Sequence, residues 1–157
     1  MAVTKSEPWY VRTLDLVKRR HEPRLDKVGR PYYQHFERVA DRLLQAVPDA
    51  TPAQVQAALL HDALEPGEMS PSELRDNGID DETIRIIQAI TLPTDGRDYL
   101  QYINDLAATR DVYAIQVKLA DNADAIANYQ ADASDAAKEM LERRFLPSRQ
   151  ILLQAVA

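Results

Sequence analysis

The sequence predicts an all-α protein, a compact bundle of about seven to nine helices. Apolar residues recur at steps of three and four along most of the chain, and the strict alternation typical of strands is scarce. Prolines, glycines and capping residues interrupt this periodicity between the expected helices. The 157 residues contain no repeat and no linker, so we expect a single domain over 1–157.

The N-terminal half carries three marked helical segments. The first runs from Ser6 to about His21 and is followed by a loop over 22–31 that is rich in Arg and Lys. The second spans 32–47 and has the clearest apolar stripe of the chain before a proline stops it. The third follows a capping sequence and is predicted over 52–64, where a Glu-Pro-Gly sequence ends it.

The C-terminal half is predicted to be helical as well, with a loop over 91–97. Its last segment begins near Ser134 and is expected to break or kink at Pro147, because proline cannot continue helical hydrogen bonding. Each of the remaining helices is predicted from an N-cap residue, an amphipathic pattern or both. They are expected near 71–77, 81–90, 99–106 and 112–126.

Composition narrows the function classes. Nineteen Lys and Arg against 25 Asp and Glu give a net charge of −6, which argues against general nucleic-acid binding and requires a local basic pocket for any phosphate. No apolar run approaches the ~20 residues of a membrane helix, and the N-terminus lacks the apolar core of a signal peptide. The absence of cysteine removes disulfides and thiolate sites. We therefore expect a cytoplasmic enzyme or binding protein.

Two of the three histidines, His35 and His61, stand where a helix would turn them inward. If the third helix continues through residue 64, Asp62 shares its apolar stripe, and a charge there must be paired or bound to a metal. Glu65 then lies on the same side of the helix end as His61 and Asp62. The alternative for Asp62 is a buried salt bridge with an arginine of the second helix, Arg38 or Arg42.

A second carboxylate is available on the long helix, where Asp121 interrupts a run of small and apolar residues. His35 borders the core face of its helix and is expected to meet His61 and Asp62 across a helix contact. Two imidazoles and two carboxylates suit Mn, Fe, Zn or Mg with positions left open for water and substrate. Such an ion polarises a phosphoryl oxygen and lowers the pKa of bound water.

This pattern resembles the HD superfamily of metal-dependent phosphohydrolases, whose signature is a lone His, an adjacent His-Asp pair and a distant Asp. Segments 21–35, 57–65 and 117–121 look like the three motifs of the RelA/SpoT-type HD domain, in the same order. The chain length is similar to that of small stand-alone alarmone hydrolases. The resemblance implies an HD-type helical fold and removal of the 3′-pyrophosphate from ppGpp or a related nucleotide.

The resemblance also implies a role for individual positions. Glu65 would orient or deprotonate the attacking water, and Lys27 and Lys138 would contact substrate phosphates. The implied cofactor is a divalent metal, most often Mn²⁺ with Mg²⁺, Zn²⁺ and Fe²⁺ as alternatives, and the implied partner is a small nucleotide. The metal ligands would be the four residues His35, His61, Asp62 and Asp121.

Three positions depart from the alarmone hydrolases. Pro66 replaces the Asp of a water-activating Glu-Asp pair, Asp26 replaces a loop Arg, and Ala125 replaces an Asn that helps to hold the nucleotide. These departures leave two alternatives open. One is an HD nucleotidase or phosphomonoesterase acting on nucleoside monophosphates, and the other is a catalytically weak regulatory module that binds metal and nucleotide. The apolar helical faces are also compatible with a homo-oligomer.

Overall fold

The structure is a computed structural model and describes residues 2–157. Over this range it contains nine α-helices, one π-helical segment and no β-strand, so the predicted all-α class is confirmed. None of the helices within residues 2–157 combines the length and apolarity that a membrane crossing requires. The helices are α1 (Pro8–His21), α2 (Tyr33–Ala46), α3 (Pro52–Leu59), α4 (Pro71–Asp76), α5 (Asp81–Ala89), α6 (Tyr99–Ala108), α7 (Val112–Ala131), α8 (Asp135–Met140) and α9 (Leu146–Ala155), with the π-helical segment at Leu141–Phe145.

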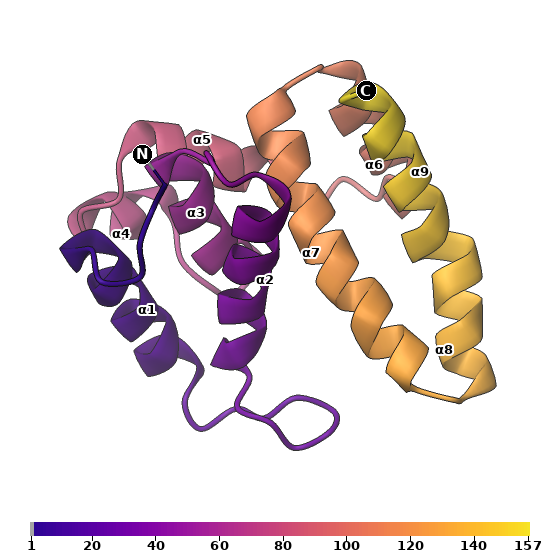
Figure 1. The fold of residues 1–157 in the computed structure, drawn as a ribbon, viewed down its shortest axis with the longest axis horizontal. Coiled ribbons are helices and arrows are strands. Elements are labelled where there is room, and N and C mark those ends of the chain that lie inside the picture. The colour runs from indigo at the N-terminus through magenta and orange to yellow at the C-terminus, as the bar shows by residue number, and fades with distance from the viewer. Residues whose placement is uncertain (1) are drawn as a thin grey trace.

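The long helix α7 occupies the centre of the bundle (Figure 1). One side of α7 packs against α2 and α3, which also pack against each other, and α5 packs against α3. On the other side α8 and α9 run beside α7, and α6 packs against α9. Side chains of α7 therefore reach both halves of the molecule.

The core lies where α2, α3, α5 and α7 meet. Its largest fully buried apolar side chains include Phe36, Leu43, Leu59, Ile87 and Ile115. Burying each such side chain contributes roughly 1.5–3 kcal/mol relative to leaving it in water. Because helices from both halves of the sequence supply these side chains, the core holds α2, α3 and α7 in a defined register around the site described below.

The predicted capping sequences are confirmed. Thr51 accepts a hydrogen bond from the Gln54 amide at 3.1 Å, and the Gln54 side chain accepts one from the Thr51 amide at 3.0 Å. Ser70 and Glu73 form the same reciprocal pair at the start of α4. Each pair satisfies amide groups that the first turn of a helix leaves without partners.

The predicted continuation of the third helix through residue 64 is wrong. Helix α3 ends at Leu59, and residues 60–64 form successive turns. The Nδ1 of His61 lies 2.9 Å from the Ala58 carbonyl, the group that the Asp62 amide would use in a continued helix. The Ala63 amide instead donates to the Leu60 carbonyl at 2.9 Å. His61 and Asp62 are therefore positioned by turns, and helical spacing does not relate them to Glu65.

The predicted break at Pro147 takes another form. Residues 141–145 adopt a π-helix between α8 and α9, and the chain continues as a helix through Pro147. Pro147 falls in the first turn of α9, where the missing amide hydrogen is least needed. The π-helical segment therefore accommodates the proline without ending the helix.

Candidate metal centre

Three of the four predicted ligands converge where α2, α7 and the turns after α3 meet. The Nε2 atoms of His35 and His61 are 3.1 Å apart, and Oδ1 of Asp121 lies 3.6 Å from the first and 3.4 Å from the second. Metal–ligand bonds of about 2.1 Å separate neighbouring ligand atoms by about 3.0 Å in an octahedron and about 3.4 Å in a tetrahedron. The spacing of the three atoms therefore fits one divalent cation.

Both imidazole rings are oriented through their other nitrogen. Nδ1 of His61 faces the Ala58 carbonyl, which only accepts hydrogen bonds, so this nitrogen carries the proton. Nδ1 of His35 lies 2.7 Å from a carboxylate oxygen of Asp124 and donates to it. In the neutral rings the two Nε2 lone pairs then face each other, and only a cation between them, a proton or a metal ion, relieves their repulsion.

The protonation states favour metal binding. Burial lowers the pKa of His61 to about 4, so this ring is neutral over the physiological range. Burial opposes ionisation of Asp121, but the nearby Lys118 ammonium group outweighs it and lowers the pKa of that carboxyl. A neutral imidazole and an ionised carboxylate are the forms that bind a divalent ion.

Lys118 contacts the site, although the sequence analysis assigned it no role. Its ammonium group is buried, donates to the Ile90 carbonyl at 3.3 Å and lies 3.4 Å from Oδ2 of Asp121. Lys118 thus binds the carboxylate oxygen that does not face the two histidines. Its place one turn before Asp121 on α7 is the only signal in the sequence.

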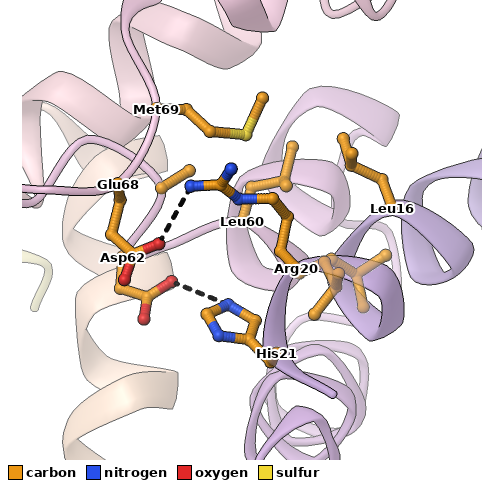
Figure 2. A pocket seen from close by; sticks show the side chains of 10 residues that line it. Leu16, Arg20, His21, Leu60, Asp62, Glu68 and Met69 are labelled. Carbon is orange, nitrogen blue, oxygen red and sulfur yellow. Dashed lines mark hydrogen bonds and ion pairs between the residues drawn. The ribbon is translucent and has the colours of Figure 1, made fainter. Parts of the chain in front are cut away.

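Asp62 lies outside the group of three converging atoms. It is 7 % exposed, and its Oδ1 faces Nε2 of His21 at 3.9 Å. Figure 2 shows these two side chains pointing toward one another in a small pocket between α1 and residues 60–69. Burial raises the pKa of Asp62 to about 7, and the charges of Glu65 and Glu68 add to this effect. Its role as a fourth ligand stays a prediction.

The alternative partners of Asp62 bind elsewhere. Both Arg38 and Arg42 make their ion pairs with Asp124 on α7. Within residues 2–157 Asp62 therefore lacks the arginine partner of a buried salt bridge, and either protonation or a bound cation offsets its charge.

Asp124 is the second residue that sequence reasoning missed. Its side chain is 0 % exposed, and its two oxygens accept hydrogen bonds from Nδ1 of His35 at 2.7 Å, Nε of Arg38 at 3.0 Å and Nε of Arg42 at 3.1 Å. Although burial opposes ionisation, the hydrogen bonds from His35 and Arg38 hold the pKa of this carboxyl well below its usual range. Asp124 follows Asp121 by three residues, and that spacing on one helix was the available signal.

Glu65 lies at the edge of the site in an exposed turn. Burial raises its pKa; Lys118 acts in the opposite direction, and Asp121 and Glu68 add to the increase. Glu68 is the next acidic residue after Pro66, but its carboxylate is engaged by Arg20 at 3.3 Å (Figure 2) and Arg24 at 3.7 Å. Glu65 is therefore the carboxylate of this segment that is available for proton transfer.

The predicted phosphate contacts lie on different parts of the surface. Lys27 is exposed at the tip of the loop between α1 and α2, with Nζ 5.6 Å from the ring centre of Tyr129. Lys138 is exposed on α8, the helix beside the C-terminal end of α7 (Figure 1). The contacts of Lys27 and Lys138 with substrate phosphates stay predictions.

The departure at Asp26 has a structural explanation. Its carboxylate accepts hydrogen bonds from the amides of Val28 and Arg30 and from Nε of Arg30, at 2.9–3.0 Å. These contacts close the loop and compensate the negative charge. Asp26 therefore acts inside its own loop and adds little negative charge to the approach of a phosphate.

The helical fold of this chain is shared with a solved structure. The match is to a metazoan ortholog of SpoT that hydrolyzes ppGpp and plays a role in starvation responses. The matched region covers 98% of this chain and 96% of the chain in the solved structure. The superposition has a TM-score of 0.71 at 19% sequence identity, which confirms the fold that the resemblance to RelA/SpoT-type domains implied. No protein-family model and no curated protein matches the chain.

Proposed function

We propose that this protein is a metal-dependent phosphohydrolase that removes the 3′-pyrophosphate from ppGpp or a similar nucleotide. The observation that carries the proposal is the pair of facing Nε2 atoms of His35 and His61, 3.1 Å apart beside Oδ1 of Asp121. Asp62 is the proposed fourth ligand, because it is a buried carboxylate that directly follows His61 in the sequence. The fold shared with a ppGpp hydrolase supports this substrate class.

A bound divalent ion would supply Lewis-acid activation of a phosphoryl oxygen and of water. Hydrolysis adds the water oxygen to phosphorus and breaks the bond from phosphorus to the 3′ oxygen. The 3′ oxygen takes up a proton from solvent to become a hydroxyl, and pyrophosphate is released. Glu65 accepts the proton of the attacking water, and its raised pKa brings it closer to the pH at which a general base works best. Lys27 and Lys138 are the proposed cations for the substrate phosphates.

Imidazole and carboxylate donors without thiolates suit Mn²⁺, Fe²⁺, Zn²⁺ or Mg²⁺. The proposed ion among these is Mn²⁺, as the resemblance to RelA/SpoT-type hydrolases implies. The proposed place of action is the cytoplasm, where small nucleotides are available. Asp121 and the two histidines require no partner subunit to converge, so activity is expected whether or not the chain forms a homo-oligomer.

A product-release assay tests the proposal. Purified protein stripped of metal is supplied with Mn²⁺, Mg²⁺, Zn²⁺ or Fe²⁺ and a panel of ppGpp, ppApp and nucleoside monophosphates, and pyrophosphate is resolved from orthophosphate. We expect pyrophosphate from ppGpp with Mn²⁺, and its loss in the Asp121→Asn variant. Asp105→Asn is the matched control, since Asp105 pairs with Arg97 on the surface.

Two other outcomes would replace the proposal. Orthophosphate from nucleoside monophosphates would favour the nucleotidase, in line with Ala125 at the position of the nucleotide-holding Asn. Nucleotide binding with no turnover of any substrate would favour the regulatory module, in line with Pro66 at the position of the second acidic residue.

A further inference from the structure

Two arginines of α2 share one carboxylate next to the metal centre. Arg38 donates to Asp124 through Nε at 3.0 Å and through Nη2 at 3.2 Å, and Arg42 donates through Nε at 3.1 Å. The same carboxylate binds Nδ1 of His35 at 2.7 Å. The two guanidinium groups are therefore separated from a candidate metal ligand by a single carboxylate.

The local charge is positive. One negative charge on Asp124 faces two positive charges on Arg38 and Arg42, although one arginine and the N–H of His35 are enough to satisfy a buried carboxylate. The chain as a whole carries −6, so a surplus cation beside the site runs against the overall composition. This surplus is a feature of the site that orienting His35 does not explain.

The surplus charge is accessible. The side chains of Arg38 and Arg42 are 26 % and 35 % exposed, whereas Asp124 beneath them is 0 % exposed. Arg42 uses only Nε for Asp124. Among the described residues, every fully buried nitrogen of the two guanidinium groups has a hydrogen-bond partner. The remaining N–H groups of the two guanidinium groups therefore face solvent, held in place by the carboxylate behind them.

A third arginine extends this arrangement. Asn128, one turn after Asp124 on α7, donates to Asp124 at 3.3 Å and accepts a hydrogen bond from Nη2 of Arg30 at 3.3 Å. The loop before α2 is thus tied to the same polar chain. Arg30, Arg38 and Arg42 line one edge of the contact between α2 and α7.

We propose that Arg38 and Arg42 form an anion subsite that binds a second phosphate group of the substrate, apart from the phosphoryl group at the metal centre. Guanidinium groups held in a fixed plane match the oxygens of phosphate with paired, charge-assisted hydrogen bonds. Asp124 provides that fixed geometry. The identity of the substrate rests on the proposed function, but the binding of a phosphate group at these arginines does not.

The direct test is calorimetric titration of inorganic pyrophosphate into the full chain in EDTA, where no metal can bind the ligand. Wild type is expected to bind, and Arg42→Gln to bind about tenfold more weakly or worse, because the variant loses a charge-assisted hydrogen bond to the ligand. Arg42→Lys, which keeps the charge, should fall between them. Arg75→Gln is the matched control, since Arg75 donates through Nε to Asp81 at 3.0 Å on a distant surface.

Two results would overturn the proposal: equal pyrophosphate affinity of wild type and Arg42→Gln, or binding that appears only when Mn²⁺ is added. The Mn²⁺ affinity and melting temperature of Arg42→Gln are measured in parallel, and the titrations are run well below the melting temperatures of both proteins, which separates loss of the subsite from loss of the fold. If the pyrophosphate result holds while no nucleotide is hydrolysed, the subsite stands and the proposed hydrolase function fails.

A second arm identifies the source of the phosphate. With Mn²⁺-loaded enzyme, Arg42→Gln should raise the KM for ppGpp about tenfold and leave the KM for guanosine 3′-diphosphate, which lacks 5′-phosphates, unchanged. If the variant instead changes only inhibition by free pyrophosphate, the arginines bind a separate anion and the assignment to the substrate is wrong.

Discussion

The carboxylate of Asp124 lies 2.7 Å from Nδ1 of His35, on the side of the ring away from His61 and Asp121. A carboxylate in this place fixes the tautomer of the ring, so that the opposite nitrogen presents a lone pair. It also prevents rotation of the ring away from the site. Asp124 is therefore a positioning residue for a candidate metal ligand, although it lies outside the motifs that the sequence offered.

Replacing Asp124 by Asn should weaken Mn²⁺ binding about 10- to 100-fold, because an amide holds His35 less strongly than a carboxylate does. The dissociation constant can be measured by calorimetry, and the tautomer of His35 by nitrogen-15 NMR of the ring. Asp105→Asn is the control on the surface. An Asp124→Asn protein that keeps the wild-type tautomer and Mn²⁺ affinity would remove this role.

Glu65→Gln should reduce kcat by about 10²- to 10⁴-fold and leave Mn²⁺ affinity nearly unchanged. The amide keeps the shape of the side chain but cannot accept the proton of the attacking water. Steady-state kinetics on the substrate that the product-release assay identifies, together with a Mn²⁺ titration, measures both quantities. Glu139→Gln, on the exposed surface of α8, serves as the control. Wild-type kcat in Glu65→Gln would assign the proton transfer to another group.

The pKa of Asp62 predicts a pH dependence of stability in the metal-free protein. The pKa of Asp62 is about 7 in the folded state, whereas the ordinary pKa of an aspartate is 3.8. Folding therefore favours the protonated form of this carboxyl. The resulting stability is fully present below pH 3.8 and is lost as the pH rises toward and through 7. Asp62→Asn should therefore be more stable than wild type at pH 8 by roughly 4 kcal/mol, and equally stable at pH 3.5.

Urea denaturation at the two pH values measures this difference. Mn²⁺ added at pH 8 should stabilise wild type more than Asp62→Asn, because only the carboxylate can act as a ligand. Equal stability of the two proteins at pH 8 would show that the charge of Asp62 is already compensated in the metal-free fold. Equal stabilisation by Mn²⁺ would exclude Asp62 as a ligand.

Phe36 supports the site from the core. Its ring is fully buried, and its centre lies 4.8 Å from that of His21, 4.9 Å from that of His61 and 5.3 Å from that of His35. Phe36→Ala should lower the free energy of unfolding by about 3–5 kcal/mol, through lost burial and the cavity left behind. Phe36→Leu should cost less but should also weaken Mn²⁺ binding, since the histidine rings lose a packing surface.

Chemical denaturation with a Mn²⁺ titration tests both effects of the Phe36 variants. Leu153→Ala is the control for loss of an apolar side chain, since Leu153 is half-exposed on α9, and it should change stability by less than about 1 kcal/mol. If Phe36→Leu binds Mn²⁺ as tightly as wild type, packing against Phe36 does not position the histidines.

Local chemistry was sufficient for much of the fold. The apolar period and the caps at Thr51 and Ser70 act within a few residues, so they determine helix class and helix starts from sequence alone. The HD pattern likewise selects His35, His61 and Asp121 before any contact is known. Residue type, spacing and order therefore determined the helical class and the three converging side chains.

Only the tertiary structure decided how these groups are held. The end of α3 at Leu59 depends on His61 taking the Ala58 carbonyl, and the orientation of His35 depends on Asp124, 89 residues away. The two arginines of α2 pair with Asp124 and not with Asp62, because the fold brings Asp124 within hydrogen-bonding distance of them. Hydrogen bonds and ion pairs act over a few ångströms whatever the separation along the chain, so spacing in the sequence cannot predict which of two nearby carboxylates an arginine will bind.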